Sequence, residues 1–202
     1  MAYLTVLILN IFSLALYYSI AIRFNIVDQP NERSSHDYVT VRGAGIIFLI
    51  TGLFWALYST GGQHLYIIIG LTSIGLISLL DDIFSLPNKL RFVIQILSVL
   101  LVFLDIGLFS SNIIIILSVS ILYLGWINAF NFMDGINGIT SFYTLSILLP
   151  LLFAVRQYPL PYTSLILFLG ISVLVFMILN VRSRALAFCG DVGAIVLAYL
   201  IG

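Results

Sequence analysis

Long apolar stretches alternate with short polar segments along the whole chain. A helix needs roughly 20 apolar residues, and at least about 17, to cross about 30 Å of hydrocarbon. Stretches near that length run over 3–22, 44–60, 65–80, 90–106, 112–127, 139–155 and 162–180. A further stretch begins near Val192 and reaches Gly202. The pattern predicts an all-α, polytopic membrane protein with about seven complete transmembrane helices and the start of an eighth, in one domain over residues 1–202.

Composition agrees with this class. Of the 202 residues, 62% are hydrophobic and 8% are charged, and the mean hydropathy is +1.21. An average soluble domain is about one quarter charged, so a soluble fold of this length would lack polar side chains to cover its surface. The net charge of zero favours no nucleic-acid partner. The first apolar stretch has no basic segment before it, so we expect a retained span and not a cleaved signal peptide.

Charged residues predict the orientation of the chain. With the N-terminus outside, the cytoplasmic gaps hold seven basic residues and the outer gaps hold Arg156: the seven are Arg23, Arg33, Arg42, Lys89, Arg91, Arg182 and Arg184. This is the bias of multi-pass plasma-membrane proteins. Seven of the eight carboxylates share those cytoplasmic gaps: Asp28, Glu32, Asp37, Asp81, Asp82, Asp134 and Asp191. We therefore expect a polar, metal-binding site at the cytoplasmic face.

The first cytoplasmic loop contains candidate phosphate-binding groups. His36 and Arg42 are placed to neutralise phosphates, as is Arg33. Gly43 and Gly45 would let backbone N–H groups approach an anion at a helix start. The alternative is a solvated loop whose charged residues cap two helices.

The second cluster is the adjacent pair Asp81 and Asp82. Carboxylates in a span are costly and adjacent like charges repel, so one of them is a candidate proton acceptor or a helper in holding a metal complex. Lys89, the only lysine, is the candidate phosphate partner. Simple solvation of a helix end is the alternative.

The third and fourth clusters carry the most specific signals. A spacing of three makes Asn128, Asn131 and Asp134 neighbours along one helix, which Gly135 and Gly138 then break on either side of Asn137. Apolar residues would serve packing better, so these side chains indicate binding. Asp191 opens the last stretch, where it could cap a helix. Beside the other acidic clusters it is the candidate ligand of Mg²⁺, with Mn²⁺ as the alternative.

Together these motifs resemble the polyprenyl-phosphate N-acetylhexosamine-1-phosphate transferases, or glycosyltransferase family 4. The resemblance rests on five segments in order: D-x-P-N-x-R-S-S-H at 28–36, a T-P-R-G-G-G-like segment at 40–45, D-D at 81–82, N-x-x-N-x-x-D-G-x-N/D-G at 128–138 and G-D-x-G at 190–193. The first of these favours the hexosamine branch over the MurNAc-pentapeptide branch. Departures are Val41 for Pro, Ala44 for Gly and Ala194 for Ser.

The resemblance implies a reaction in a bacterial plasma membrane. A polyprenyl phosphate, such as undecaprenyl phosphate, would attack the β-phosphorus of a UDP-N-acetylhexosamine, with GlcNAc as the expected sugar, and release UMP to begin cell-envelope polysaccharide synthesis. It implies Asp191 as Mg²⁺ ligand and Asp81 or Asp82 as the group acting on the lipid phosphate, with base and positioning roles left open. The row from Asn128 to Asn137 would line the nucleotide-sugar site.

Length qualifies this expectation. About eleven residues after Asp191 give roughly 16 Å of helix, about half a membrane, and a helix that ends there unpaired would leave carbonyls in lipid. Family members run past 300 residues, so we expect a C-terminally truncated portion with weak or no activity on its own.

Other functions stay open at this stage. They are a noncatalytic remnant or assembly partner, an Asp-rich membrane prenyltransferase, and a transporter or proton relay. The second lacks D-x-x-x-D spacing and the third lacks acids at mid-membrane depth. The sequence does not determine the UDP-sugar, the polymer or the oligomeric state, for which a homodimer is one option.

Overall fold

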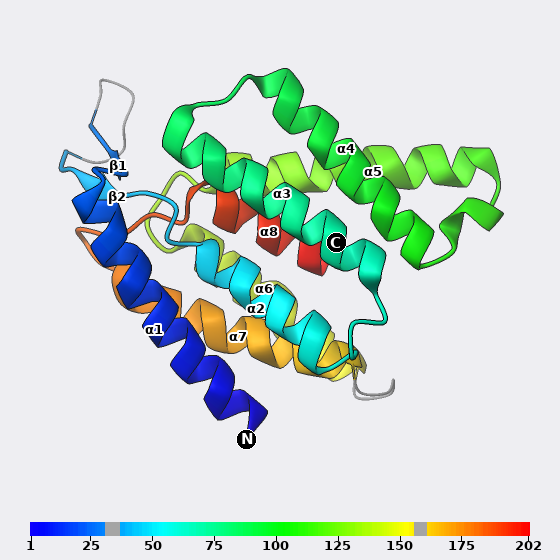
Figure 1. Ribbon diagram of the computed structural model, residues 1–202, viewed down its shortest axis with the longest axis horizontal. Helices are drawn as coiled ribbons and strands as arrows, with labels where there is room; N and C mark the ends of the chain where they lie inside the picture. The colour runs from blue at the N-terminus through cyan, green and yellow to red at the C-terminus, as the bar shows by residue number, and fades with distance from the viewer. Residues whose placement is uncertain (31–36, 156–160) are drawn as a thin grey trace.

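The computed structural model describes residues 1–30, 37–155 and 161–202. Within these ranges the chain is almost entirely helical, so the predicted all-α class is confirmed. The elements in chain order are α1 (Ala2–Arg23), β1 (Val27–Asp28), β2 (Thr40–Val41), α2 (Ile46–Tyr58), α3 (Leu65–Phe84), α4 (Asn88–Asp105), the short 3-10 helix η1 (Leu108–Ser110), α5 (Ile113–Met133), α6 (Ile139–Val155), α7 (Pro161–Asn180) and α8 (Gly190–Ile201) (Figure 1).

The helices differ in their capacity to cross a membrane. By length and composition α1, α3, α5 and α7 are sufficient among the described residues, while α2, α6 and α8 are apolar but shorter. The 18 residues of α4 include the three charged residues Lys89, Arg91 and Asp105. The predicted stretches all form helices, and four of the seven predicted complete spans meet the requirement for a span.

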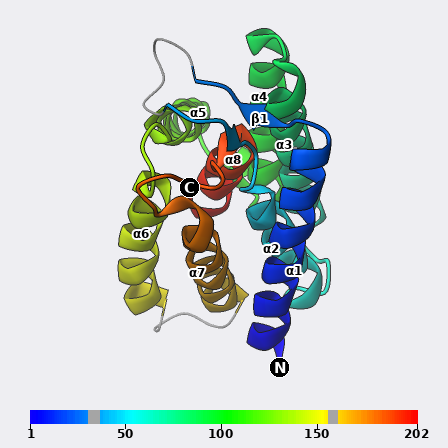
Figure 2. The ribbon, with the colours of Figure 1, turned by 90° about the vertical axis from the view of Figure 1, so that its left-hand side faces the viewer.

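Helix α8 occupies the centre of the bundle, as two views at right angles show (Figures 1 and 2). From Val192 to Tyr199 every residue is buried, and α8 packs against α2, α3 and α5. Its approach to α2 depends on glycine, because a Cβ on Gly45 would lie 2.3 Å from the Cα of Gly193. An apolar helix buried on all sides is expected to be hydrophobic all round, which explains the sequence of α8.

The carbonyl groups near the end of α8 have partners inside the bundle. Trp126 on α5 donates its indole N–H to the carbonyl of Ala198 at 3.0 Å, and the Tyr123 hydroxyl donates to the carbonyl of Tyr199 at 2.7 Å. The Ala198 carbonyl also accepts the backbone N–H of Gly202 at 3.0 Å. Aromatic side chains of α5 therefore hold the last turn of α8 within the bundle.

The segment before α2 is fastened to the segment before α8. Strands β1 and β2 pair antiparallel, with Val27 opposite Val41, and Val41 also forms a parallel bridge to Ala187. The backbone N–H groups of Ala44 and Gly45 donate to the carbonyls of Phe188 and Cys189, at 3.0 and 2.9 Å. The N–H group of Gly45 therefore binds a backbone carbonyl and not a phosphate, whereas an approach of phosphate to Gly43 stays a prediction.

Candidate functional site

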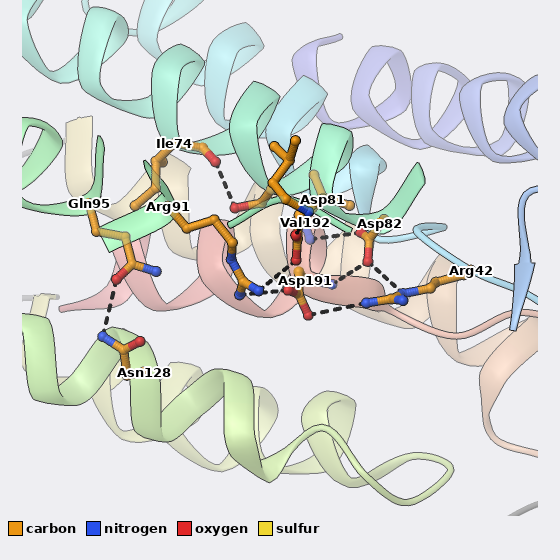
Figure 3. Close-up of polar contacts among 11 residues, drawn as sticks. Arg42, Ile74, Asp81, Asp82, Arg91, Gln95, Asn128, Asp191 and Val192 are labelled. Atoms are coloured by element: carbon orange, nitrogen blue, oxygen red, sulfur yellow. Dashed lines mark hydrogen bonds and ion pairs between the residues drawn. The ribbon is translucent and has the colours of Figure 1, made fainter. Parts of the chain in front are cut away.

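Charged side chains from four separate segments meet at one end of the bundle (Figure 3). Asp81 and Asp82 come from the last turns of α3, and Arg91 comes from the first turn of α4. Arg42 follows β2, and Asp191 lies in the first turn of α8. The structure thus brings together the second and fourth predicted clusters and one residue of the first.

Asp82 holds the N-terminus of α8. Its side chain is fully buried, and its carboxylate accepts hydrogen bonds from the backbone N–H groups of Asp191 at 2.9 Å and Val192 at 3.0 Å. It also accepts one from Arg42 Nε at 2.8 Å. A carboxylate at a helix N-terminus satisfies donors that have no partner within the helix and interacts favourably with the helix dipole. Asp82, and not Asp191, therefore performs the capping role that the sequence considered for Asp191.

Glycine permits this close contact. Gly190, which precedes Asp191, has φ +74°, and a Cβ there would lie 2.5 Å from a carboxylate oxygen of Asp82. Any other residue at this position would be strained by its backbone conformation and would also collide with Asp82. The glycine of the G-D-x-G segment is thus explained by the approach of α3 to α8.

Asp81 and Asp191 converge on a single guanidinium group. Arg91 Nη1 lies 2.6 Å from Asp81 Oδ2, and Arg91 Nη2 lies 2.7 Å from Asp191 Oδ2. The other oxygen of Asp81 accepts the backbone N–H of Leu86 at 2.6 Å, which fixes the turn between α3 and α4. Of the three aspartates, Asp191 has the most exposed side chain, at 16% against 5% for Asp81. Asp191 is therefore the carboxylate best placed to meet a ligand.

Asp134 lies on the other side of the α8 N-terminus. It follows α5 and accepts a hydrogen bond from the Thr140 hydroxyl at 2.5 Å and another from the backbone N–H of Gly190. Burial raises the pKa of Asp134 to about 6, and the nearby charge of Asp191 acts in the same direction. This predicted site residue is thus joined to the aspartate cluster.

The predicted asparagine row is divided among different contacts. Asn128 donates to Gln95 Oε1 on α4 at 3.1 Å and to its own helix at the carbonyl of Leu124. Asn137 donates to the carbonyl of Arg182 at 3.0 Å, which ties the α5–α6 connection to the α7–α8 connection. Asn131 is half-buried. Asn128 and Asn137 therefore have structural partners, and binding by this row stays a prediction.

The remaining predicted residues lie apart from the cluster or cannot be placed. Lys89 is exposed in the first turn of α4. His36 and Arg33 lie outside the described residues. His64, which precedes α3, pairs with Asp105 at the opposite end of the bundle.

Two contributors were not predicted from the sequence. Arg91 was noted beside Asp81 and Asp82 without a role, although it joins Asp81 to Asp191. The Tyr17 hydroxyl, on α1, donates to the carbonyl of Arg42 at 2.8 Å and so supports the segment that carries the arginine. The hydroxyl group of Tyr17 within an apolar span could have indicated a polar contact in the sequence. The ten-residue separation of Arg91 from Asp81 offered no comparable signal, because it spans a helix–turn–helix connection.

A divalent cation fits part of this cluster. The described residues contain no group of three or more His, Cys, Asp or Glu side chains arranged to hold a metal. Asp81 and Asp191 nevertheless lie within hydrogen-bonding distance of each other and share one cation, Arg91. Mg²⁺ in enzymes is commonly held by one or two carboxylates together with substrate phosphates. The donor set therefore suits Mg²⁺ bound along with a phosphorylated substrate, and not a complete protein cage.

Comparison with known families decides the classification. The profile of glycosyl transferase family 4 matches residues 64–202, which include Asp81, Asp82, Asp134 and Asp191. The chain belongs to this family. The predicted resemblance is thereby confirmed, and with its apolar helices the chain is a membrane-embedded member of glycosyl transferase family 4.

Two curated relatives match most of the chain. A probable undecaprenyl-phosphate N-acetylglucosaminyl 1-phosphate transferase of Bacillus subtilis is 28% identical over 199 residues, which cover 90% of this chain and 55% of the relative. A phospho-N-acetylmuramoyl-pentapeptide-transferase of Thermotoga maritima is 26% identical over 176 residues, which cover 78% of this chain and 57% of the relative. The chain thus spans about half the length of the curated relatives it matches.

Proposed function

We propose that residues 1–202 form one integral membrane domain of a transferase that moves HexNAc-1-phosphate, and specifically GlcNAc-1-phosphate, from a UDP-sugar to a polyprenyl phosphate. The convergence of Asp81 and Asp191 on Arg91 is the observation that carries this proposal. Family membership supports it, as do the transferase activities after which both relatives are named. The proposed site faces the cytoplasm of a bacterial plasma membrane, because the basic residues lie predominantly at that end of the helices.

The reaction requires two anions to meet. An oxygen of the lipid phosphate forms a bond to the β-phosphorus of the UDP-sugar, the bond from that phosphorus to the bridging oxygen breaks, and UMP leaves with the bonding electrons. Asp191 would hold Mg²⁺ with Asp81 beside it, because these two carboxylates already share one cation, Arg91. The ion would offset the charge that develops on the transferred phosphoryl group.

The paired aspartates have different roles in this proposal. All three donors to Asp82 are in place and its side chain is fully buried, so it positions α8 and Asp191 and does not accept a proton from substrate. Asp81 is the member of the pair that acts on the lipid phosphate, beside the metal ligand. Asp134 and Asn131 bind the nucleotide sugar, and Lys89, exposed in the first turn of α4, attracts phosphate.

A transfer assay tests the proposal. The chain in lipid nanodiscs is given UDP-GlcNAc labelled in the sugar, undecaprenyl phosphate and Mg²⁺, and label in the lipid fraction and released UMP are measured. The same assay is run on a chimera in which this chain replaces the matched half of the Bacillus subtilis relative. We expect the chimera to catalyse transfer even if the 202-residue chain alone does not. Asp191→Asn should lower the rate of transfer by about 1,000-fold, which is the size of the loss when a group that stabilises transition-state charge is removed.

The control replaces an arginine outside the cluster. Arg23→Gln, at the exposed end of α1, removes one charge on the same side of the bundle and should leave transfer within about twofold of the parent. Transfer that survives Asp191→Asn, or no transfer by either protein, contradicts the proposal. Release of UMP without labelled lipid points to hydrolysis and contradicts the acceptor assignment.

A further inference from the structure

Arg91 lies where a second cation would have to enter. Its two terminal nitrogens contact the carboxylates of Asp81 and Asp191 at 2.6 and 2.7 Å, distances typical of charge-assisted hydrogen bonds. The guanidinium therefore bridges the same two carboxylates that we assign to Mg²⁺. A metal ion that binds both must replace at least one of these contacts.

The charge of the cluster favours that exchange. Three carboxylates, Asp81, Asp82 and Asp191, face two guanidinium groups, Arg42 and Arg91, so one negative charge is left over when all five are ionised. Without a cation between them, Asp81 and Asp191 would repel each other at hydrogen-bonding distance. Arg91 relieves this repulsion while no metal is bound. A divalent ion bound between Asp81 and Asp191 would relieve the same repulsion, and so would supply the charge that Arg91 supplies to them.

The two arginines of the cluster are not equivalent. Arg42 is anchored to the fully buried Asp82 through Nε at 2.8 Å, and its nearest approach to Asp191 is 3.7 Å. Arg91 instead contacts both Asp81 and Asp191, at 2.6 and 2.7 Å, with a side chain that is 20% exposed against 32% for Arg42. A metal ion on Asp81 and Asp191 would therefore compete with Arg91, because Arg91 and not Arg42 occupies both of these carboxylates.

We propose that Arg91 is the resident counter-ion of Asp81 and Asp191, which holds the two carboxylates together before metal binds and gives up its contact with Asp191 to the divalent cation. This inference rests on the proposed function for the assignment of the metal to Asp191. It makes Arg91 a positioning residue and a competitor of the metal. Its consequence is that the arginine weakens metal binding while stabilising the metal-free protein.

Metal binding measures this directly, without any transfer reaction. Mn²⁺ is titrated into the 202-residue chain in nanodiscs of zwitterionic lipid, and free Mn²⁺ is followed by electron paramagnetic resonance. The pH is about 8, where carboxylates are ionised. We expect Arg91→Gln to bind Mn²⁺ about tenfold more tightly than the parent. In the parent, Mn²⁺ must displace the charged hydrogen bond between Arg91 and Asp191, and the variant lacks that bond. We expect the thermal midpoint of the metal-free variant to fall, and added Mn²⁺ to raise it more than in the parent.

Matched variants separate the possible results. Arg91→Lys keeps one charge but cannot bridge both carboxylates with a planar fork, so its Mn²⁺ affinity should lie between those of the parent and Arg91→Gln. If Arg91→Gln does not fold, tighter Mn²⁺ binding by Arg91→Lys than by the parent supports the proposal in its place. Arg23→Gln, which removes a charge from the end of α1, should leave Mn²⁺ affinity unchanged.

Mn²⁺ binding by Asp191→Asn separates the inference about Arg91 from the proposed function, in which Asp191 is the metal ligand. Equal or weaker Mn²⁺ binding by both Arg91 variants, with binding lost in Asp191→Asn, overturns the inference for Arg91 and leaves the metal assignment intact. Binding that persists in Asp191→Asn, or no binding by the parent or either Arg91 variant, overturns the metal assignment and the inference with it.

Discussion

The two ends of the helical bundle treat charge in different ways. At one end Asp81, Asp82 and Asp191 share Arg42 and Arg91, and Asp134 lies close by. At the other end Asp105, from the last turn of α4, pairs with His64, which precedes α3, at 2.5 Å. The first end gathers side chains from five segments. The second joins the two ends of one helical hairpin.

The difference concerns excess charge. The His64–Asp105 pair matches one acid with one base, so it can fasten α3 to α4 without attracting a further ion. The aspartate cluster leaves a carboxylate unmatched, which costs stability in a partly buried place. A cluster that retains such a cost is better explained by a ligand than by packing. Variants at each end can therefore separate an interaction that holds the fold from one that prepares a site.

The largest effect is expected for Asp82→Ala. The change leaves the Arg42 guanidinium and the N–H groups of Asp191 and Val192 without their acceptor. Breaking a buried pair in this way costs about 3–5 kcal/mol of the free energy of unfolding. Reversible unfolding in mixed detergent micelles, followed by circular dichroism, provides the measurement.

Asp191→Asn is the matched control for that experiment. The Asn side chain leaves in place the backbone N–H that residue 191 donates to Asp82, and the Asp191 side chain is partly exposed. The loss in the free energy of unfolding should therefore be smaller than for Asp82→Ala, about 1 kcal/mol. An Asp82→Ala protein as stable as Asp191→Asn would contradict the capping role of Asp82.

An intermediate effect is expected at the opposite end. Asp105→Asn keeps the shape of the side chain and removes its charge, which weakens the contact to His64 and should lower the free energy of unfolding by about 1 kcal/mol. In the chimera described above, transfer should stay near the parental level. A large loss of transfer with unchanged unfolding would show that this end also takes part in function.

A separate effect concerns the pH dependence of stability. The pKa of Asp134 is raised in the folded protein to about 6 from its ordinary value of 3.8. Folding therefore favours the protonated carboxyl, and this contribution to stability is complete below about pH 4 and lost as pH rises through about 6. Unfolding measured across that interval should show the decline in the parent and a weaker one in Asp134→Asn. Identical pH profiles of the two proteins would contradict the raised pKa.

The helices and most charged members of the cluster were predictable from the sequence, and the contacts between them were not. Apolar stretches of sufficient length predicted every helix, because helices and closed barrels are the structures that satisfy their backbone in lipid. Asp81, Asp82, Asp134 and Asp191 lie in alternate polar gaps between the apolar stretches, which predicted that they share one membrane face. This pattern could not reveal that Asp82 caps α8, because that contact joins residues 109 positions apart.

Two other results depended on packing. Gly43 and Gly45 suggested a phosphate-binding backbone, yet Gly45 permits close approach between the start of α2 and the start of α8. The asparagine row suggested one binding surface, yet Asn128 contacts α4 and Asn137 contacts the α7–α8 connection. In both cases local spacing showed which residues share a side of an element, but not which neighbour that side meets.

By itself the sequence determined the class of protein, the helices, the side on which the acids gather and the family. Burial of apolar segments and the preference for cytoplasmic arginine and lysine act locally, so their patterns can be read along the chain. Only the tertiary structure showed which aspartate of the adjacent pair caps α8 and which lies beside the proposed metal ligand. Asp81 and Asp82 are adjacent in the chain, but the helix directs one toward Arg91 and the other toward Arg42 and α8, and this difference in partners separates their roles.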